Sequence, residues 1–326
     1  MRAIVIKQHG GPEVLEIQER PRPEPKAGQV LIEVKAFGVN HAEIYFRQGA
    51  WGDVAEISGI ECAGIVRADA TGRLSPGQQV VAIVGGMGRS INGSYAEYTA
   101  VPATNVVPVA TDLAWEDLAA IPESYATAWS CLFGNLALAA GQTVLIRGAT
   151  SALGQAAINI AAYAGARVIA TTRSPQRVAG LEALGAKQVL FETDCLRGGV
   201  REHYPAGIDA VLDLIGNTTV LDSLATVRRD GRVCLAGFLG GGGPIANLEP
   251  VFQIPSGRHL SVFASALVTG TAEYPLAEIP FQDIIDRVAH GHYKARPARI
   301  FEFPDIREAH RLMESSQANG KIVVRV

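Results

Sequence analysis

The chain has 326 residues, of which 48% are hydrophobic and 19% charged, and its formal net charge is −3 at pH 7. This length suits two domains better than one small core, and the composition is that of a globular protein rather than a disordered one. Because no basic block is present, we expect no nucleic-acid partner. No stretch reaches the roughly 18 apolar residues of a membrane span, and the first residues lack the apolar core of a signal peptide, so we expect a cytoplasmic protein without a membrane partner.

The four cysteines are far apart in the sequence, and none belongs to a C-x-x-C pair. Neither a disulfide framework nor a structural zinc site is therefore indicated. We expect reduced thiols at Cys62, Cys131, Cys195 and Cys234.

Residues 1–122 are predicted to be rich in β-strands. Short runs of branched residues such as "RAIVI" and "VLIEVKAFGV" recur in this part of the chain. Gly and Pro interrupt the runs at intervals too short for long helices. We therefore expect a β-rich first domain.

The pattern changes after Pro122, because residues 123–265 alternate continuous Val/Ile/Leu runs with helical stretches. Such runs fit strands that are covered on both faces, which predicts a parallel sheet flanked by helices. The fold class is therefore α/β, with a doubly wound, nucleotide-binding second domain. The expected strands are "TVLIR", "RVIAT", "QVLF", "DAVLDLIG", "RVCLAG" and "LSVFASALV".

Residues 266–326 are predicted to contain helices at 281–290 and 305–317 and a final strand, "GKIVVRV". A strand that follows a cofactor domain has to pair with some sheet. A return to the sheet of the first domain is the simplest arrangement.

The segment 143–164 is predicted to be a strand, a tight turn and an alanine-rich helix. A dinucleotide-binding turn has glycine at three spaced positions, and here those positions hold Ala149, Ser151 and Gly154. All three are small, so a pyrophosphate can approach the backbone N–H groups and the N-terminus of the helix. Ser151 could in addition donate a hydrogen bond from its hydroxyl group to the pyrophosphate. An ordinary alanine-rich helix behind a strand would give the same pattern. The candidate diphosphate-binding residues are Ala149, Thr150, Ser151, Ala152, Leu153 and Gly154.

The end of the next expected strand, "RVIATT", favours NADPH over NADH. An NAD enzyme usually has Asp or Glu here, roughly 20 residues past the first glycine, to bind the ribose hydroxyls. This chain has the uncharged Thr172, followed by Arg173 and Ser174, with Arg177 one helical turn later. Two guanidinium groups can hold the additional phosphate of NADPH, which a carboxylate would repel. A solvated basic helix start is the alternative interpretation.

Six segments of the chain form a set that is specific only when taken together. They are "GPEVLEI" at 11, "AGQVLIEVKAFGVNHAEIYFRQG" at 27, "SGIECAGIV" at 58, "YATAW" at 125, "DAVLDLIG" at 209 and "NGKIVV" at 319. The chain resembles, essentially end to end, the zinc-free quinone oxidoreductase and enoyl reductase branch of the medium-chain dehydrogenase/reductase superfamily. The resemblance implies a GroES-like substrate domain at 1–122, a Rossmann NADPH-binding domain at 123–265, a segment at 266–326 that returns to the substrate domain, a cleft between the domains, and a homodimer.

By position, the resemblance also implies that no catalytic metal is bound. Zinc-dependent relatives have Cys in the segment that matches "GVN" and His in the segment that matches "GIE", where this chain has Asn40 and Ile60. Neither side chain replaces a thiolate or an imidazole on Zn²⁺. Without a Lewis acid to polarise an alcohol, we expect hydride delivery to an activated acceptor.

The resemblance assigns roles to individual residues. Asn40 and Tyr45 resemble the polar pair beside the nicotinamide, where Tyr45 could donate a proton or a hydrogen bond to the substrate oxygen. The alternatives are a tyrosine at the mouth of the cleft and an asparagine that caps its loop. The implied cofactor contacts are the nicotinamide-facing Thr127, the strand-end residues Gly216, Gly237 and Phe238, and Lys321 near the phosphates, although Lys321 could equally be a surface lysine.

Four further side chains have more than one interpretation. Glu192 stands where many relatives place a Tyr beside the additional phosphate, and its charge is unfavourable there unless it turns away or pairs with Arg173. Glu61 could be a general base, but a structural hydrogen bond or ion pair is expected. His290 and His292 are expected to be exposed surface residues rather than a metal site.

These observations predict an NADPH-dependent reductase that transfers a hydride, without metal, to a quinone or an α,β-unsaturated carbonyl compound as its small-molecule substrate. Two alternatives remain open. One is an enoyl-thioester reductase of fatty-acid or polyketide type, and the other is a non-catalytic cofactor-binding or RNA-binding member of the family.

Overall fold

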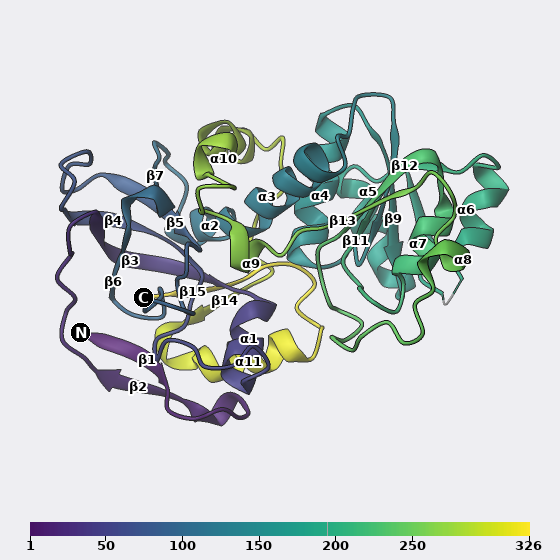
Figure 1. The fold of residues 1–326 in the computed structure, drawn as a ribbon. Coiled ribbons are helices and arrows are strands. Elements are labelled where there is room, and N and C mark those ends of the chain that lie inside the picture. The colour runs from purple at the N-terminus through teal and green to yellow at the C-terminus, as the bar shows by residue number, and fades with distance from the viewer. Residues whose placement is uncertain (194) are drawn as a thin grey trace. The chain divides into compact units, whose positions relative to one another are not determined.

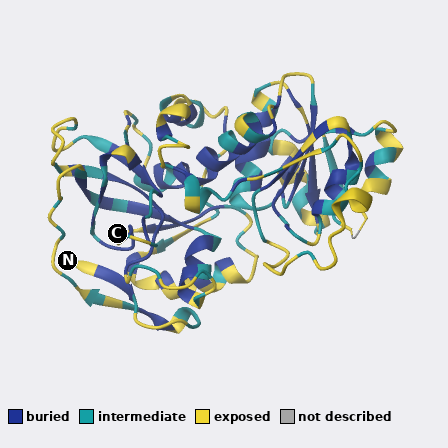
Figure 2. Ribbon diagram, viewed as in Figure 1, coloured by how far each residue is buried: buried dark blue, intermediate teal, exposed yellow. Residues whose placement is uncertain are grey.

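The computed structural model describes residues 1–193 and 195–326, and the chain divides into two compact units (Figure 1). Unit 1 comprises Met1–Ala126, Ser265–Gly291 and Ala295–Val326, and unit 2 comprises Thr127–Ala264 and His292–Lys294. Each unit has a buried apolar core of its own, drawn in dark blue in Figure 2. Among the helices of the described residues, none is long and apolar enough to cross a membrane.

Unit 1 contains a seven-stranded, mostly antiparallel sheet that corresponds to the predicted β-rich domain. Its order is β14-β15-β3-β4-β5-β7, and β6 also pairs with β3. The strands are β3 (Gln29–Val39), β4 (Glu61–Asp69), β5 (Gln79–Ile83), β6 (Tyr98–Pro102), β7 (Val106–Pro108), β14 (Arg299–Glu302) and β15 (Ile322–Arg325), beside a separate antiparallel pair of β1 (Arg2–Ile6) and β2 (Leu15–Glu19).

The predicted return of the chain to its first sheet is confirmed. Strand β15 lies antiparallel to β3, with Ile322 opposite Val39, and parallel to β14. The segment "IVV" of β15 is fully buried in the core of unit 1, so that its apolar side chains, rather than backbone pairing alone, determine where it docks.

The helices of unit 1 flank this sheet, and the two that were expected near the C-terminal end are present. Helix α10 matches the predicted span 281–290, and α11 is shorter than the predicted 305–317 because Ser316, with φ +57°, leaves the helical conformation. The helices are α1 (His41–Gln48), α2 (Trp115–Ala119), α3 (Pro122–Trp129, which continues into unit 2), α9 (Ser265–Val268), α10 (Phe281–Ala289) and α11 (Ile306–Glu314).

Unit 2 is a six-stranded parallel sheet in the order β10-β9-β8-β11-β12-β13. Counted from the first strand of the unit, this is the order 3-2-1-4-5-6 of the dinucleotide-binding Rossmann fold. All six predicted strands are present, so the α/β expectation is confirmed. They are β8 (Thr143–Arg147), β9 (Arg167–Thr172), β10 (Gln188–Phe191), β11 (Ile208–Asp213), β12 (Val227–Leu235) and β13 (His259–Val262).

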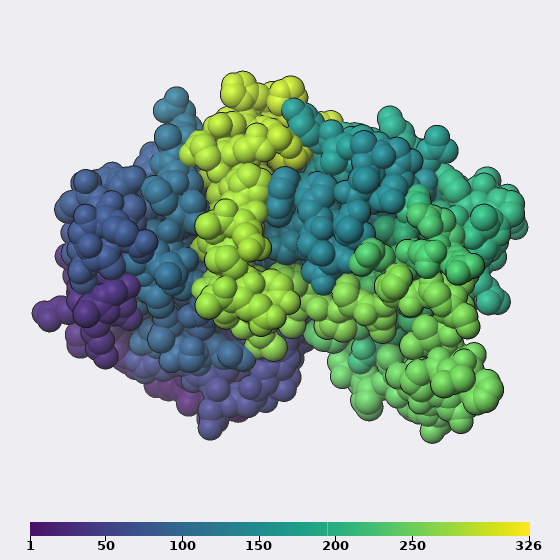
Figure 3. Space-filling model, turned by 45° about the horizontal axis from the view of Figure 1, so that its top comes forward, coloured from purple at the N-terminus to yellow at the C-terminus, as the bar shows by residue number. Residues whose placement is uncertain are grey.

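Helices cover the sheet of unit 2. Helix α4 packs on β8 and β9, and α7 packs on β11 and β12, which explains why these strands have apolar residues on both faces. The short α8 lies on the surface of the unit (Figure 3). The helices are α4 (Ala152–Tyr163), α5 (Val178–Leu184), α6 (Arg197–His203), α7 (Val220–Thr226) and α8 (Pro250–Gln253).

Candidate functional site

The predicted dinucleotide-binding turn connects the end of β8 to the start of α4. Gly148 has φ +76°, a left-handed conformation that favours glycine. A Cβ atom on Gly154 would lie 2.7 Å from the Cα atom of Ala149, so that only glycine allows the helix to approach the turn this closely. The turn is therefore shaped by backbone contact, as the role of the third fingerprint glycine requires.

Ser151 is the N-cap residue of α4. Its Oγ atom accepts a hydrogen bond from the Gly154 N–H group (3.1 Å) and donates to the Gly148 carbonyl (2.9 Å). In this structure the Ser151 hydroxyl donates its proton within the turn, and its donation to a phosphate stays a prediction. The N–H groups of Ala152 and Leu153 have no acceptor within the helix, and they lie at its positive end, where an anion is favoured.

The end of β9 lies beside this turn. The Thr171 hydroxyl accepts a hydrogen bond from the Gly148 N–H group (3.3 Å), and the Thr172 hydroxyl accepts one from the N–H group of Ser174 (3.1 Å). Arg173 is exposed and Arg177 is partly exposed, and neither forms an ion pair with another described residue. This strand end thus carries two cationic side chains whose charge is not balanced locally.

The loops after β11 and β12 lie at the same edge of the sheet. The buried Asp213 carboxylate accepts hydrogen bonds from the N–H groups of Ile215 (3.0 Å) and Gly216 (3.1 Å). A Cβ atom on Gly216 would lie 2.9 Å from the Gly237 carbonyl oxygen, so the two loops meet backbone to backbone, with Phe238 following. The C-terminal strand ends thus bring together the candidate residues of unit 2 from four segments, at the edge where such sheets bind ligands.

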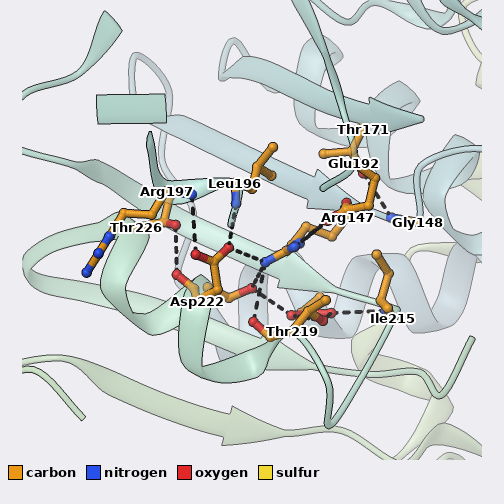
Figure 4. A network of polar contacts seen from close by, with 12 residues as sticks. Arg147, Gly148, Thr171, Glu192, Leu196, Arg197, Ile215, Thr219, Asp222 and Thr226 are labelled. Atoms are coloured by element: carbon orange, nitrogen blue, oxygen red, sulfur yellow. Dashed lines mark hydrogen bonds and ion pairs between the residues drawn. The ribbon is translucent and has the colours of Figure 1, made fainter. Parts of the chain in front are cut away.

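Sequence reasoning missed a buried arginine directly before the turn. Arg147, the last residue of β8, is completely buried, and its guanidinium group forms ion pairs with Glu192 and with Asp222 (2.9 Å) (Figure 4). Burial alone would lower the pKa of Arg147, but the hydrogen bond and charge of Glu192 and the charges of Asp213 and Asp222 raise it. The signal in the sequence was a charged residue at the end of an apolar strand, which requires a buried partner.

This network resolves the open question about Glu192. Its carboxylate turns to Arg147 rather than to Arg173. The side chain therefore does not place a free negative charge beside the two exposed arginines.

Unit 1 contains a second polar cluster, around Asn40. The Lys321 ammonium nitrogen lies 2.5 Å from Glu61 Oε1 and 2.5 Å from Asn40 Oδ1, and Asn40 Nδ2 donates to Glu61 Oε1 (2.9 Å). The other oxygen of Glu61 accepts from the Glu123 N–H group (2.7 Å). Lys321 and Glu61 are 4% and 0% exposed, so the expected structural ion pair of Glu61 is confirmed.

The structure places both Lys321 and Asn40 in this cluster. Lys321 is not a surface lysine, because its side chain is buried and its ammonium group is paired with Glu61. Asn40 is the N-cap residue of α1, and its side chain is hydrogen-bonded to Lys321 and Glu61.

Glu43, in the first turn of α1, adds a buried carboxyl group beside the cluster. It accepts hydrogen bonds from the N–H groups of Asn40 (2.8 Å) and Ile60 (3.1 Å). Burial and, to a smaller extent, the charge of Glu61 raise its pKa to about 7, against the opposing effects of backbone hydrogen bonds, including the one from Ile60, and of the Lys321 charge. Glu43 is therefore partly protonated near neutral pH.

Tyr45 lies on α1 between two rings. Its ring centroid is 5.4 Å from that of Trp51 and 6.4 Å from that of His41. Burial raises its pKa, so the phenol remains protonated at neutral pH and can donate a hydrogen bond.

Thr127, the remaining candidate, is buried on α3 at the first position of unit 2.

The two histidines near the end of α10 are both exposed, as expected for His290 and His292. Within residues 1–193 and 195–326, no group of three or more His, Cys, Asp or Glu side chains is arranged to hold a metal ion.

Two family models match this chain. The model described as "Alcohol dehydrogenase GroES-like domain" matches residues 26–111, and "Zinc-binding dehydrogenase" matches residues 152–281. The quinone oxidoreductase of Lama guanicoe is 31% identical over 253 residues, which cover 74% of this chain and 74% of that protein. The chain belongs to the quinone oxidoreductase branch of the medium-chain dehydrogenase/reductase superfamily.

Other relatives match over nearly the whole length of the chain. One polypeptide of the phenolphthiocerol/phthiocerol polyketide synthase of Mycobacterium tuberculosis is 28% identical over 345 residues, which cover 98% of this chain and 14% of the synthase polypeptide. The solved structure of mycobacterial Rv1454c complexed with NADPH has a TM-score of 0.87 and 28% identity, and the match covers 100% of both chains. The expected family and fold are confirmed, and the protein is an oxidoreductase with a small-molecule substrate and a fold that indicates a nicotinamide cofactor.

Proposed function

We propose that this oxidoreductase uses NADPH to reduce quinones or α,β-unsaturated carbonyl compounds without a metal ion. One observation carries the coenzyme assignment. The open N–H groups at the tip of α4 lie beside a strand end that carries Arg173 and Arg177, while the nearby carboxylate of Glu192 is neutralised by Arg147.

The residues of unit 2 fit such a coenzyme. The N–H groups of Ala152 and Leu153 would hold the diphosphate, since the turn before them has only small side chains at Ala149 and Ser151. Arg173, with Arg177 and Ser174, would hold the 2′-phosphate. The loops of Gly216, Gly237 and Phe238, together with Thr127, would accommodate the nicotinamide half. When bound, the coenzyme supplies a hydride for the electrophilic carbon of the substrate.

On the substrate side, we propose that Tyr45 donates a hydrogen bond or a proton to the carbonyl oxygen as negative charge develops there. The raised pKa of its phenol keeps the proton in place at neutral pH. Among the described residues, none accepts a hydrogen bond from the Tyr45 hydroxyl. Asn40, whose amide is held by Lys321 and Glu61, would orient the ligand through a side chain that cannot rotate freely.

We also propose that the enzyme needs no zinc. The oxygen and nitrogen atoms of the Asn40 amide are both bonded to neighbouring side chains, and Ile60 is a buried apolar residue with no ligand atom. The Lys321 ammonium group already supplies the positive charge next to Glu61. Metal analysis of the purified protein should find far less than one equivalent of zinc, and stoichiometric zinc would contradict this proposal.

An enoyl-thioester reductase is the second candidate, because the match to the polyketide synthase spans 98% of this chain. NADPH oxidation should be measured with 9,10-phenanthrenequinone, with a simple enone and with crotonyl-CoA. Turnover of the quinone or the enone supports the first proposal, and turnover of crotonyl-CoA alone supports the second. Tight NADPH binding without turnover of any of the three would favour a non-catalytic protein.

We further propose a homodimer that forms along β13, the edge strand of the sheet in unit 2. Val262 on this strand is 60% exposed, and Phe252 on the preceding helix, α8, is 86% exposed. An unpaired edge strand with apolar side chains favours pairing with a second copy of the same strand.

A further inference from the structure

Glu192 follows directly after β10, which places it beside the end of β9, where the exposed Arg173 and the partly exposed Arg177 follow. Phe191 pairs with Thr172 across β10 and β9, and the Glu192 N–H group donates to the Thr172 carbonyl oxygen (2.9 Å). Its backbone is therefore adjacent to the residue that precedes Arg173. A carboxylate turned toward that side would compete with a phosphate group for the Arg173 guanidinium.

Arg147 holds the carboxylate on the other side. The guanidinium Nε and Nη2 atoms both bond to Glu192, with Nε 3.1 Å from Oε1, and the side chains of the pair are 0% and 11% exposed. The guanidinium is itself fixed at its opposite end, because Nη1 donates to Asp222 Oδ2 (2.9 Å) and to the Ser223 hydroxyl (3.1 Å). A buried, two-point pair of this kind allows the carboxylate little freedom to turn.

We propose that Arg147 is a positioning residue for coenzyme selection, which keeps the Glu192 carboxylate neutralised and turned away so that Arg173 and Arg177 remain available to a 2′-phosphate. Arg147 does this without touching the coenzyme. The inference rests on the proposed use of NADPH. It predicts that the choice between NADPH and NADH depends on a side chain that lies below the binding surface.

The test is a set of binding measurements on the full chain, by titration with NADPH and with NADH. Arg147→Gln should raise the dissociation constant for NADPH relative to that for NADH by about tenfold, because the released carboxylate opposes only the phosphorylated coenzyme. Adding Glu192→Gln to this variant should restore most of the preference. If the role of Arg147 were merely structural, its substitution would raise the dissociation constants for both coenzymes equally. The additional Glu192→Gln substitution would then not restore the wild-type values.

Asp222→Asn is the matched control. It removes the other ion pair of Arg147 but leaves the Glu192 contact intact, so the ratio of the two dissociation constants should stay at the wild-type value. If Arg147→Gln does not fold, as judged by circular dichroism, Arg147→Lys should show a smaller shift in the same direction, since Lys cannot make the two-point contact.

The two proposals fail differently. A wild-type protein without a preference for NADPH overturns the proposed coenzyme and, with it, this inference. A wild-type preference that persists unchanged in the Arg147 variants overturns the inference alone.

Discussion

Lys321 and Glu61 form a buried ion pair that links the residue before β15 to the first residue of β4. Both side chains are removed from water, so each charge depends on the other for compensation. The pair also fixes Asn40, which makes it the structural support of the proposed substrate site.

Removal of one partner of this pair should destabilise the protein strongly. Lys321→Met leaves the Glu61 carboxylate buried without its counter-charge, at a cost of about 3–5 kcal/mol in the free energy of unfolding. The double variant, Lys321→Met with Glu61→Gln, should lose less unfolding free energy than the sum of the losses of the two single variants. Chemical denaturation of the three variants measures this coupling, and strictly additive losses would show that the pair is not a unit.

Glu43 should make stability depend on pH. Its pKa of about 7 in the folded protein lies above the ordinary value of 4.5, so the folded state binds the proton more tightly than the unfolded state. The stabilisation is complete below about pH 4.5 and is lost as the pH rises toward 7, by up to about 3 kcal/mol. The difference in unfolding free energy between wild type and Glu43→Gln should follow this curve; a difference that stays constant between pH 4.5 and 7 would contradict the assignment.

The exposed arginines should determine the coenzyme. Arg173→Ala combined with Arg177→Ala should raise the Michaelis constant for NADPH by about 10- to 100-fold, because two charge-assisted hydrogen-bond partners of the phosphate are lost. The constant for NADH should change little. Steady-state kinetics with both coenzymes test this, and equal increases would refute the phosphate assignment.

The phenol of Tyr45 should contribute to turnover. Tyr45→Phe keeps the ring contacts with Trp51 and His41 but removes the donor, so kcat should fall by about 10²-fold or more if this group transfers the proton. Trp51→Phe is a useful control, because it alters the packing and keeps the hydroxyl. An unchanged rate in the phenylalanine variant at position 45 would assign protonation to solvent.

The edge strand should control assembly. Val262→Lys places a charge on the exposed face of β13, where it disfavours strand pairing between copies. Light scattering should then show a monomer in place of the proposed wild-type dimer, with unchanged circular dichroism. A wild-type protein that is already monomeric would overturn the proposed assembly.

The strands of unit 2 were predictable because burial on both faces leaves uninterrupted apolar runs, as in "TVLIR" and "DAVLD". Helix α10 was predictable from its amphipathic pattern. The small residues at 149, 151 and 154 likewise indicated the turn, because close backbone approach excludes larger side chains. These features depend on local sequence.

The polar networks were not predictable in the same way, because their partners come from distant segments. Glu61 and Lys321 are 260 positions apart, and Arg147 finds Glu192 and Asp222 on two different elements. The hydrogen bond from the Ser151 hydroxyl to the Gly148 carbonyl was likewise not predictable, because it depends on the three-dimensional path of the turn. The sequence indicated that Glu192 either turns away or pairs with Arg173, but not that Arg147 is its partner.

The pairing of β15 with β3 has a consequence for biosynthesis. Almost the whole chain separates the two strands, whereas the six strands of unit 2 all lie within one continuous stretch. As the polypeptide leaves the ribosome, the inserted Rossmann unit can complete its sheet before β15 has been synthesised and can pair with β3. The edge of β3 that β15 covers therefore stays unpaired in the nascent chain until well after the strands of the Rossmann unit have been made.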